Sequence, residues 1–196
     1  MTDAAPARDP LRTRRIAVTL IAAAASIALD LWTKAWAWEN LRYKPAVVVF
    51  DKLFYLEFSF NTGSAFGLLG GQDFARPFFI VVTLLTLGYM GYLVRRLPTD
   101  RVYGYLAIGL VMGGAVGNLH DRIVRVMELG GELRHGVVDW ILVYYLPGKP
   151  WPNFNVADIA LVIGVGLLLP YLMLHAEPAE DAAKDRGEGE KPSDAG

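Results

Sequence analysis

The chain has 196 residues, of which 54% are hydrophobic and 20% are charged, with a formal net charge of −1 and no cysteine. This length fits one domain or at most two. The absence of cysteine excludes disulfides, thiol nucleophiles and cysteine-ligated zinc or iron–sulfur sites.

Four long stretches of the chain carry few or no charged residues. Residues 78–94, 102–119 and 159–174 contain none, and residues 16–38 contain only Asp30 and Lys34. A helix that crosses a bilayer core about 30 Å thick needs about 20 apolar residues. We therefore predict an all-α membrane protein. Its four transmembrane helices are expected at about residues 16–38, 77–94, 102–119 and 156–174.

The first stretch has an alternative interpretation as a secretory signal peptide, because basic residues precede it and small residues lie around 22–26. Its apolar run continues to Trp38, however, and three more spans follow. We expect this helix to be retained in the mature protein.

Basic residues gather before the first span and in the short turn between the second and third. The positive-inside rule places such segments in the cytoplasm, so residues 1–15 and both termini are expected there. The tail of residues 176–196 is acidic and lacks apolar spacing, which predicts disorder. Nothing in the sequence indicates a nucleic-acid surface. The basic residues are Arg8, Arg12, Arg14 and Arg15, then Arg95, Arg96 and Arg101.

The segment after the first span is typical of strands. Residues 46–50 and 53–60 are rich in β-branched and aromatic side chains and are separated by Asp51 and Lys52. Aromatic side chains favour the headgroup level of a bilayer. We predict a small β element on the outer membrane surface.

Polar side chains at the ends of the spans are functional candidates, because such groups are costly in lipid. Each also has a purely structural interpretation. The first span offers an i,i+4 ion pair, the third a packing surface of small residues (113–117) with a terminal salt bridge, and the fourth a capping box. The residues concerned are Asp30 and Lys34, then Asn118, Asp121 and Arg122, then Asn155 and Asp158.

Asp139 favours the functional over the structural interpretation, because it is a lone carboxylate in the apolar segment 136–144. Asp139 and Asp158 are both expected at the outer boundary. Two carboxyls in a dry site share one proton, so one can accept a proton from water while the other polarises a carbonyl. This combination indicates amide hydrolysis by an aspartyl dyad.

Other chemistries fit less well. The sequence has no H-E-x-x-H motif for a zinc protease, whereas Ser64 and His120 leave open a serine–histidine dyad. A small transporter or channel lined by polar residues is the main alternative, although no internal repeat is visible. A non-enzymatic scaffold is the third possibility, and it would tolerate asparagine at both aspartates.

Five motifs resemble, in order, those of the lipoprotein signal peptidases (signal peptidase II), over about residues 16–174. They are D-x-x-x-K at 30–34, N-T-G-S-A-F-G at 61–67, G-G-A-V-G-N-L-H-D-R at 113–122, V-V-D-W at 137–140 and F-N-V-A-D at 154–158. The resemblance implies a bacterial membrane aspartyl protease that cleaves prolipoproteins just before a diacylglyceryl-modified cysteine. It also implies four spans with a small extracytoplasmic β-cradle at about residues 44–75, within a catalytic membrane domain of residues 16–175.

The resemblance also implies roles for single residues. The expected catalytic pair is Asp139 and Asp158. The residues expected to shape the site and hold the substrate are Asn61, Gly63, Asn118, Arg122 and Asn155. The site is expected to be positioned by Asp30, Lys34 and Asp121. The partners implied are modified prolipoproteins and membrane lipid. No metal or organic cofactor is expected, and we expect a monomer in the cytoplasmic membrane.

One segment departs from the family pattern. The connection from Ile123 to Val138 has sixteen residues and is longer than usual in the family. Gly130-Gly131 within it predicts a turn, so we expect a small hairpin or extended loop beside the site.

Overall fold

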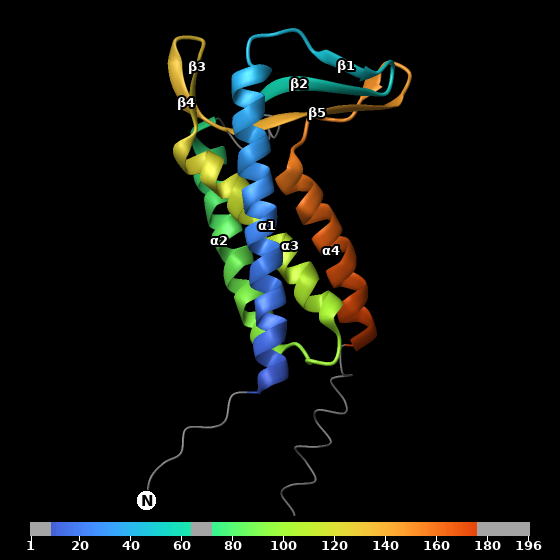
Figure 1. Cartoon of the computed structure of the whole chain (residues 1–196). Helices are drawn as coiled ribbons and strands as arrows, with labels where there is room; N and C mark the ends of the chain where they lie inside the picture. Colours follow the sequence, from blue (N-terminus) through green and yellow to red (C-terminus); the bar gives the residue numbers. More distant parts are fainter. Residues whose placement is uncertain (1–8, 64–71, 176–196) are drawn as a thin grey trace, which may run out of the picture.

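The computed structural model describes residues 9–63 and 72–175 of the chain. Four helices form a bundle: α1 (Pro10–Asn40), α2 (Gln72–Arg96), α3 (Val102–Val124) and α4 (Val156–His175) (Figure 1). All four are long and apolar enough to cross a membrane, as predicted. The predicted acidic tail, the first eight residues and Ser64 lie outside the described residues.

Helix α3 lies in the centre of the bundle, between α1 and α4, because glycines allow both helices to approach it closely. A Cβ atom added at Gly113 would lie 2.5 Å from the Cβ of Ser26 on α1. One added at Gly114 would lie 2.4 Å from the carbonyl oxygen of Ala157 on α4. The close approach predicted from the small residues at 113–117 is therefore confirmed.

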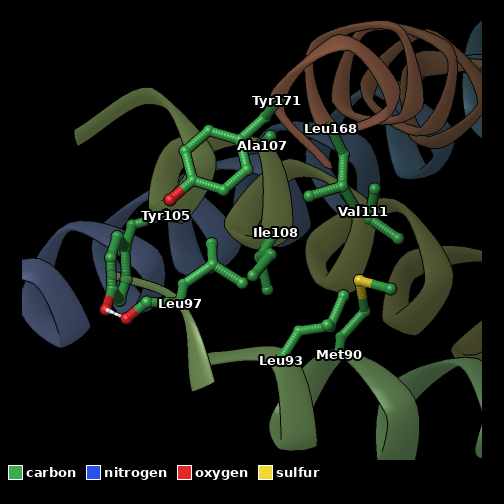
Figure 2. Close-up of a cluster of buried hydrophobic side chains, with 9 residues drawn as sticks. All are labelled: Met90, Leu93, Leu97, Tyr105, Ala107, Ile108, Val111, Leu168 and Tyr171. Atoms are coloured by element: carbon green, nitrogen blue, oxygen red, sulfur yellow. Dashed lines mark hydrogen bonds between the residues drawn. The ribbon is translucent and has the colours of Figure 1, made fainter. Parts of the chain in front are cut away.

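A buried apolar cluster holds α2, α3 and α4 together near the α2–α3 turn (Figure 2). The Tyr105 hydroxyl donates to the carbonyl of Leu97, and Thr19 Oγ1 on α1 donates to the carbonyl of Tyr105, each at 2.9 Å. Both described ends of the chain lie at this end of the bundle (Figure 1).

A four-stranded antiparallel sheet covers the opposite end of the bundle (Figure 1). Its strand order is β1 (Val47–Phe50), β2 (Phe54–Asn61), β5 (Val137–Leu146) and β6 (Lys149–Pro150). The two strands predicted after the first span are present. Strand β5 was not predicted, so the expected cradle range of 44–75 holds only part of the sheet, and its last residues belong to α2.

An aromatic contact ties the sheet to the helices, and a separate hairpin lies outside the sheet. The Trp38 ring near the end of α1 packs edge-on against Phe58 and Phe60 of β2, with centroids 5.7 and 6.0 Å away. Strands β3 (Val126–Leu129) and β4 (Glu132–His135) form a separate hairpin that turns at Gly130 and Gly131. The hairpin predicted in the long connection is therefore present.

Candidate active site

The ten polar and glycine positions singled out in the sequence come from five elements, and their contacts join them at the sheet end of the bundle. They come from α1, from the end of β2, from the last turns of α3, from β5 and from the start of α4. In that order they are Asp30 and Lys34; Asn61 and Gly63; Asn118, Asp121 and Arg122; Asp139; and Asn155 and Asp158.

The start of α4 is a reciprocal capping box. The backbone N–H of Asp158 donates to Asn155 Oδ1, and the backbone N–H of Asn155 donates to Asp158 Oδ2, both at 3.1 Å. These bonds satisfy donors that the first turn of a helix would otherwise leave unpaired. The predicted cap is confirmed, yet Asp158 Oδ1 remains to accept from Asn118 Nδ2 at 2.8 Å. Capping therefore uses only one oxygen of this carboxylate.

Asp139 lies on β5 with 3% of its surface exposed, and its hydrogen-bond partners come from distant parts of the chain. Oδ2 accepts from Asn61 Nδ2 at 3.0 Å and Oδ1 accepts from Asn155 Nδ2 at 2.7 Å. Burial, and then the charge of Asp158, raise the pKa of Asp139 to about 7. At neutral pH this carboxyl can hold a proton.

Two asparagine amides connect the carboxyls. Asn155 Nδ2 lies within hydrogen-bond distance of Asp139 Oδ1, of Asn118 Oδ1 at 3.2 Å and of the carbonyl of Val138 at 3.3 Å. Asn118 in turn donates to Asp158. A continuous path of hydrogen bonds thus runs from Asp139 through Asn155 and Asn118 to Asp158.

Lys34 joins this path from α1. Its Nζ is fully buried and lies 2.8 Å from Asp30 Oδ2, 2.8 Å from Asn118 Oδ1 and 3.8 Å from Asp121 Oδ2. Asp30 Oδ1 accepts from the backbone N–H of Ala157 in the first turn of α4 at 2.9 Å. The predicted Asp30–Lys34 pair is therefore present, and it also connects α1 to α3 and α4.

Asp121 fixes the strand that carries Asp139. Its Oδ2 accepts from the backbone N–H of Val138 at 3.0 Å, and its Oδ1 accepts from Arg125 Nε at 3.0 Å. The terminal salt bridge expected at the end of α3 thus forms with Arg125. Arg125 was missed in the sequence because it lies one residue beyond the helix, although the i,i+4 spacing from Asp121 signals the pair.

Arg122 and Gly63 contact two of the asparagines that bond the carboxyls. The Arg122 guanidinium lies 4.7 Å from the centre of the Phe79 ring and donates to the carbonyl of Asn118 at 3.3 Å. Gly63 has a φ of +85°, and a Cβ there would lie 3.1 Å from that of Ala75. Its N–H donates to Asn61 Oδ1 at 2.9 Å, so the Asn61 amide faces Asp139 with its nitrogen.

The described residues contain no group of three or more histidine, aspartate or glutamate side chains placed to hold a metal ion. The chemistry that the described geometry supports is proton transfer between two carboxyls and a water molecule held by amides.

Comparisons with known proteins identify the family of this chain. The family described as Signal peptidase (SPase) II matches residues 22–174. The lipoprotein signal peptidase of Syntrophotalea carbinolica is 36% identical over 159 residues, which are 81% of this chain and 92% of that protein. The lipoprotein signal peptidase of Geobacillus thermodenitrificans is 34% identical, over 84% of this chain and 94% of that protein.

Two solved structures have a similar fold. One bacterial membrane enzyme is 27% identical, with a TM-score of 0.63 over 79% of this chain and 91% of its own. Another shares the fold at 24% identity, with a TM-score of 0.65 over 91% of this chain and 94% of its own. These similarities give no support to a transporter. The chain is a multi-pass bacterial membrane peptidase and belongs to the signal peptidase II family.

Proposed function

We propose that this protein removes signal peptides from prolipoproteins as an aspartic endopeptidase, cutting the bond before a diacylglyceryl-modified cysteine. The observation that carries the proposal is the pair of carboxyls joined through Asn118 and Asn155, one of them buried with a pKa raised to about 7. The substrate class is that of its relatives, which are lipoprotein signal peptidases.

The pair can supply both an acid and a base. Burial favours Asp139 as the holder of the proton, and in this proposal Asp158 acts as the base. Asp158 accepts a proton from water as the water oxygen bonds to the scissile carbonyl carbon, and Asp139 gives its proton to the carbonyl oxygen. When the carbon–nitrogen bond breaks, the proton on Asp158 passes to the leaving nitrogen and the hydroxyl returns its proton to Asp139.

The surrounding residues orient this chemistry. Each oxygen of Asp139 and Asp158 accepts one hydrogen bond from the protein. The second lone pair of these oxygens is left for a shared water. Asn61 and Gly63 present the end of β2 to the substrate backbone, and Arg122 supplies positive charge near both aspartates. Asp30, Lys34 and Asp121 act as positioning residues through Asn118 and Val138.

The orientation in the membrane follows from the basic residues. Arg12 and Arg15 of α1 donate to backbone carbonyls of Arg95, Thr99 and Asp100 at the α2–α3 turn, so both basic segments lie at one end of the bundle. We place that end and both termini in the cytoplasm and the site at the outer face. The signal helix then lies in lipid against the spans, and the protein acts as a monomer.

The test is cleavage of a diacylglyceryl-modified prolipoprotein by purified protein in lipid. Asp139→Asn and Asp158→Asn should each lower turnover by about 10²- to 10⁴-fold, the usual contribution of a proton-transferring group. Asp100→Asn makes the same change at an exposed position in the α2–α3 turn and should leave turnover unchanged. Ordinary turnover by Asp139→Asn would overturn the dyad.

The melting temperature separates catalysis from capping at Asp158. Asparagine also caps helices well, so Asp158→Asn should keep most of the stability of α4 while it loses activity. A loss of activity that only follows a large fall in melting temperature would assign Asp158 to the cap alone.

A further inference from the structure

A pocket of about 480 Å³ lies between the β3–β4 hairpin and the start of α2, and the mechanism above does not use it. One wall is β4, which contributes Arg134 and His135, and the other is the first turns of α2, which contribute Arg76 and Ile80. Thr62 lines it between them. The hairpin β3–β4 stands over the start of α2 at the sheet end of the bundle (Figure 1).

Three connections place this pocket next to the site. Thr62 directly follows Asn61, whose amide bonds Asp139. His135 is four residues before Asp139, at the point where β4 leads into β5. Arg76 Nε donates to the carbonyl of Arg122 at 3.0 Å. An extended chain that leaves the two carboxyls on this side enters the pocket within a few residues.

The charges of the lining favour an anion. Arg134 pairs with Glu132, whose side chain is 68% exposed, so this pair is open to exchange of partners. Among the side chains that the structure describes, no carboxylate lies within ion-pair distance of Arg76. Burial, and then the charge of Arg76, lower the pKa of His135, so this ring is neutral at neutral pH. The described charged side chains that line the pocket are Arg76, Arg134 and Glu132, and together they carry one positive charge.

The direction of the substrate decides what can reach this pocket. If the proposed function holds, the signal helix lies in the bilayer, so the chain after the cleaved bond must leave toward the outer water. The hairpin that lines the pocket lies at the sheet end of the bundle (Figure 1), which is the outer end in the proposed orientation. A lipid headgroup could also supply an anion, but Thr62 in the lining directly follows Asn61, whose amide bonds Asp139, and this favours the substrate chain.

We propose that the β3–β4 hairpin and the start of α2 form a subsite for the mature part of the prolipoprotein. It binds the second to fourth residues after the cleaved bond and prefers an acidic side chain there, which Arg134 and Arg76 contact. The long connection between α3 and β5 thus has a role in substrate selection, which rests on the proposed function.

The experiment compares three modified prolipoproteins that differ only at those positions, with aspartate, asparagine or lysine. For the wild type, kcat/KM should be about two- to fivefold higher with aspartate than with lysine, which is what one partly exposed ion pair supplies. Arg134→Glu should reverse this order, so that the lysine substrate is cleaved with the higher kcat/KM. High salt should reduce the preference.

Lys149→Glu is the matched control, since it makes the same change of charge at an exposed position on β6, at the other end of the sheet. It should leave the preference of the wild type intact. Equal effects of Arg134→Glu and Lys149→Glu would mean general attraction by the outer surface and would overturn the subsite.

Two further outcomes separate the proposals. Cleavage of all three substrates at one rate would overturn the subsite and leave the peptidase intact, whereas no cleavage of any would overturn the proposed function. Cleavage in vesicles of phosphatidylcholine with and without phosphatidylglycerol tests whether the anion in the pocket is a lipid headgroup. If Arg134→Glu changed only the dependence on phosphatidylglycerol, the pocket would be a headgroup site and the substrate proposal would be wrong.

Discussion

Lys34 offers a sharp test of the polar network, because its ammonium is fully buried and touches the site. Lys34→Met keeps the length of the side chain and removes the charge. The variant leaves Asp30 without its ion pair and Asn118 Oδ1 without one donor. Breaking one partner of a buried pair costs about 3–5 kcal/mol, whereas one lost hydrogen bond costs about 1 kcal/mol. The unpaired carboxylate of Asp30 therefore dominates the expected loss.

The double variant Asp30→Asn/Lys34→Met separates these contributions. Asparagine keeps an oxygen for the N–H of Ala157 and removes the unpaired charge, so the double variant should be more stable than Lys34→Met by about 2 kcal/mol or more. Reversible unfolding in bicelles measures the free energy of unfolding of Lys34→Met and of the double variant. Lys44→Met, at an exposed position, is the control. A double variant less stable than Lys34→Met would refute the buried pair.

Three other variants test the acid, the helix packing and an interhelical hydrogen bond. The raised pKa of Asp139 means that the folded state holds a proton more tightly than the unfolded state, whose value is 3.8. The resulting stability is present below about pH 4 and lost as the pH rises through 7. Asp139→Asn removes this pH dependence, so between pH 5 and 8 its melting temperature should rise relative to that of the wild type. If the two curves of melting temperature against pH ran parallel, the raised pKa of Asp139 would be contradicted. Gly113→Ala places a Cβ 2.5 Å from the Cβ of Ser26, so it should lower the free energy of unfolding by about 1–3 kcal/mol. Gly91→Ala on α2 is the control, because the new Cβ meets nothing within 4 Å and should be neutral or stabilising. Equal free energies of unfolding for the two variants would show that α1 can shift away from α3. Thr19→Val removes the bond to the carbonyl of Tyr105 and should cost about 0.6–2 kcal/mol in the same unfolding measurement, and no loss would mean that another donor replaces it.

The four spans and the start of α4 were predictable because each depends on local sequence. A run of about 20 apolar residues has one stable form in lipid, a helix whose backbone bonds lie within the segment. The capping box depends on two residues three positions apart, so Asn155 and Asp158 could be identified without knowledge of the fold. The hairpin at Gly130 and Gly131 was predictable for the same reason.

Strand β5 was missed because its residues 137–142 are mostly buried, which removes the alternation that marks a half-exposed strand. The sequence showed there only an apolar segment with one carboxylate. Its partner β2 lies more than 70 residues away, and the register that sets Ser59 opposite Asp139 depends on that pairing. No local pattern could show which amide would reach Asp139.

The same limit explains why the structural and functional interpretations of the polar residues are not exclusive. Asp30 pairs with Lys34 locally, but only packing of α1 against α3 and α4 brings Lys34 to Asn118 and Asp30 to Ala157. In lipid these bonds hold the helices together beside Asn118, which is part of the path that joins the two carboxyls. Any variant that loosens the helix contact must therefore move Asn118 as well, and with it the carboxyl of Asp158. Stability and turnover should change together at Lys34, whereas at Asp139 they should change in opposite directions.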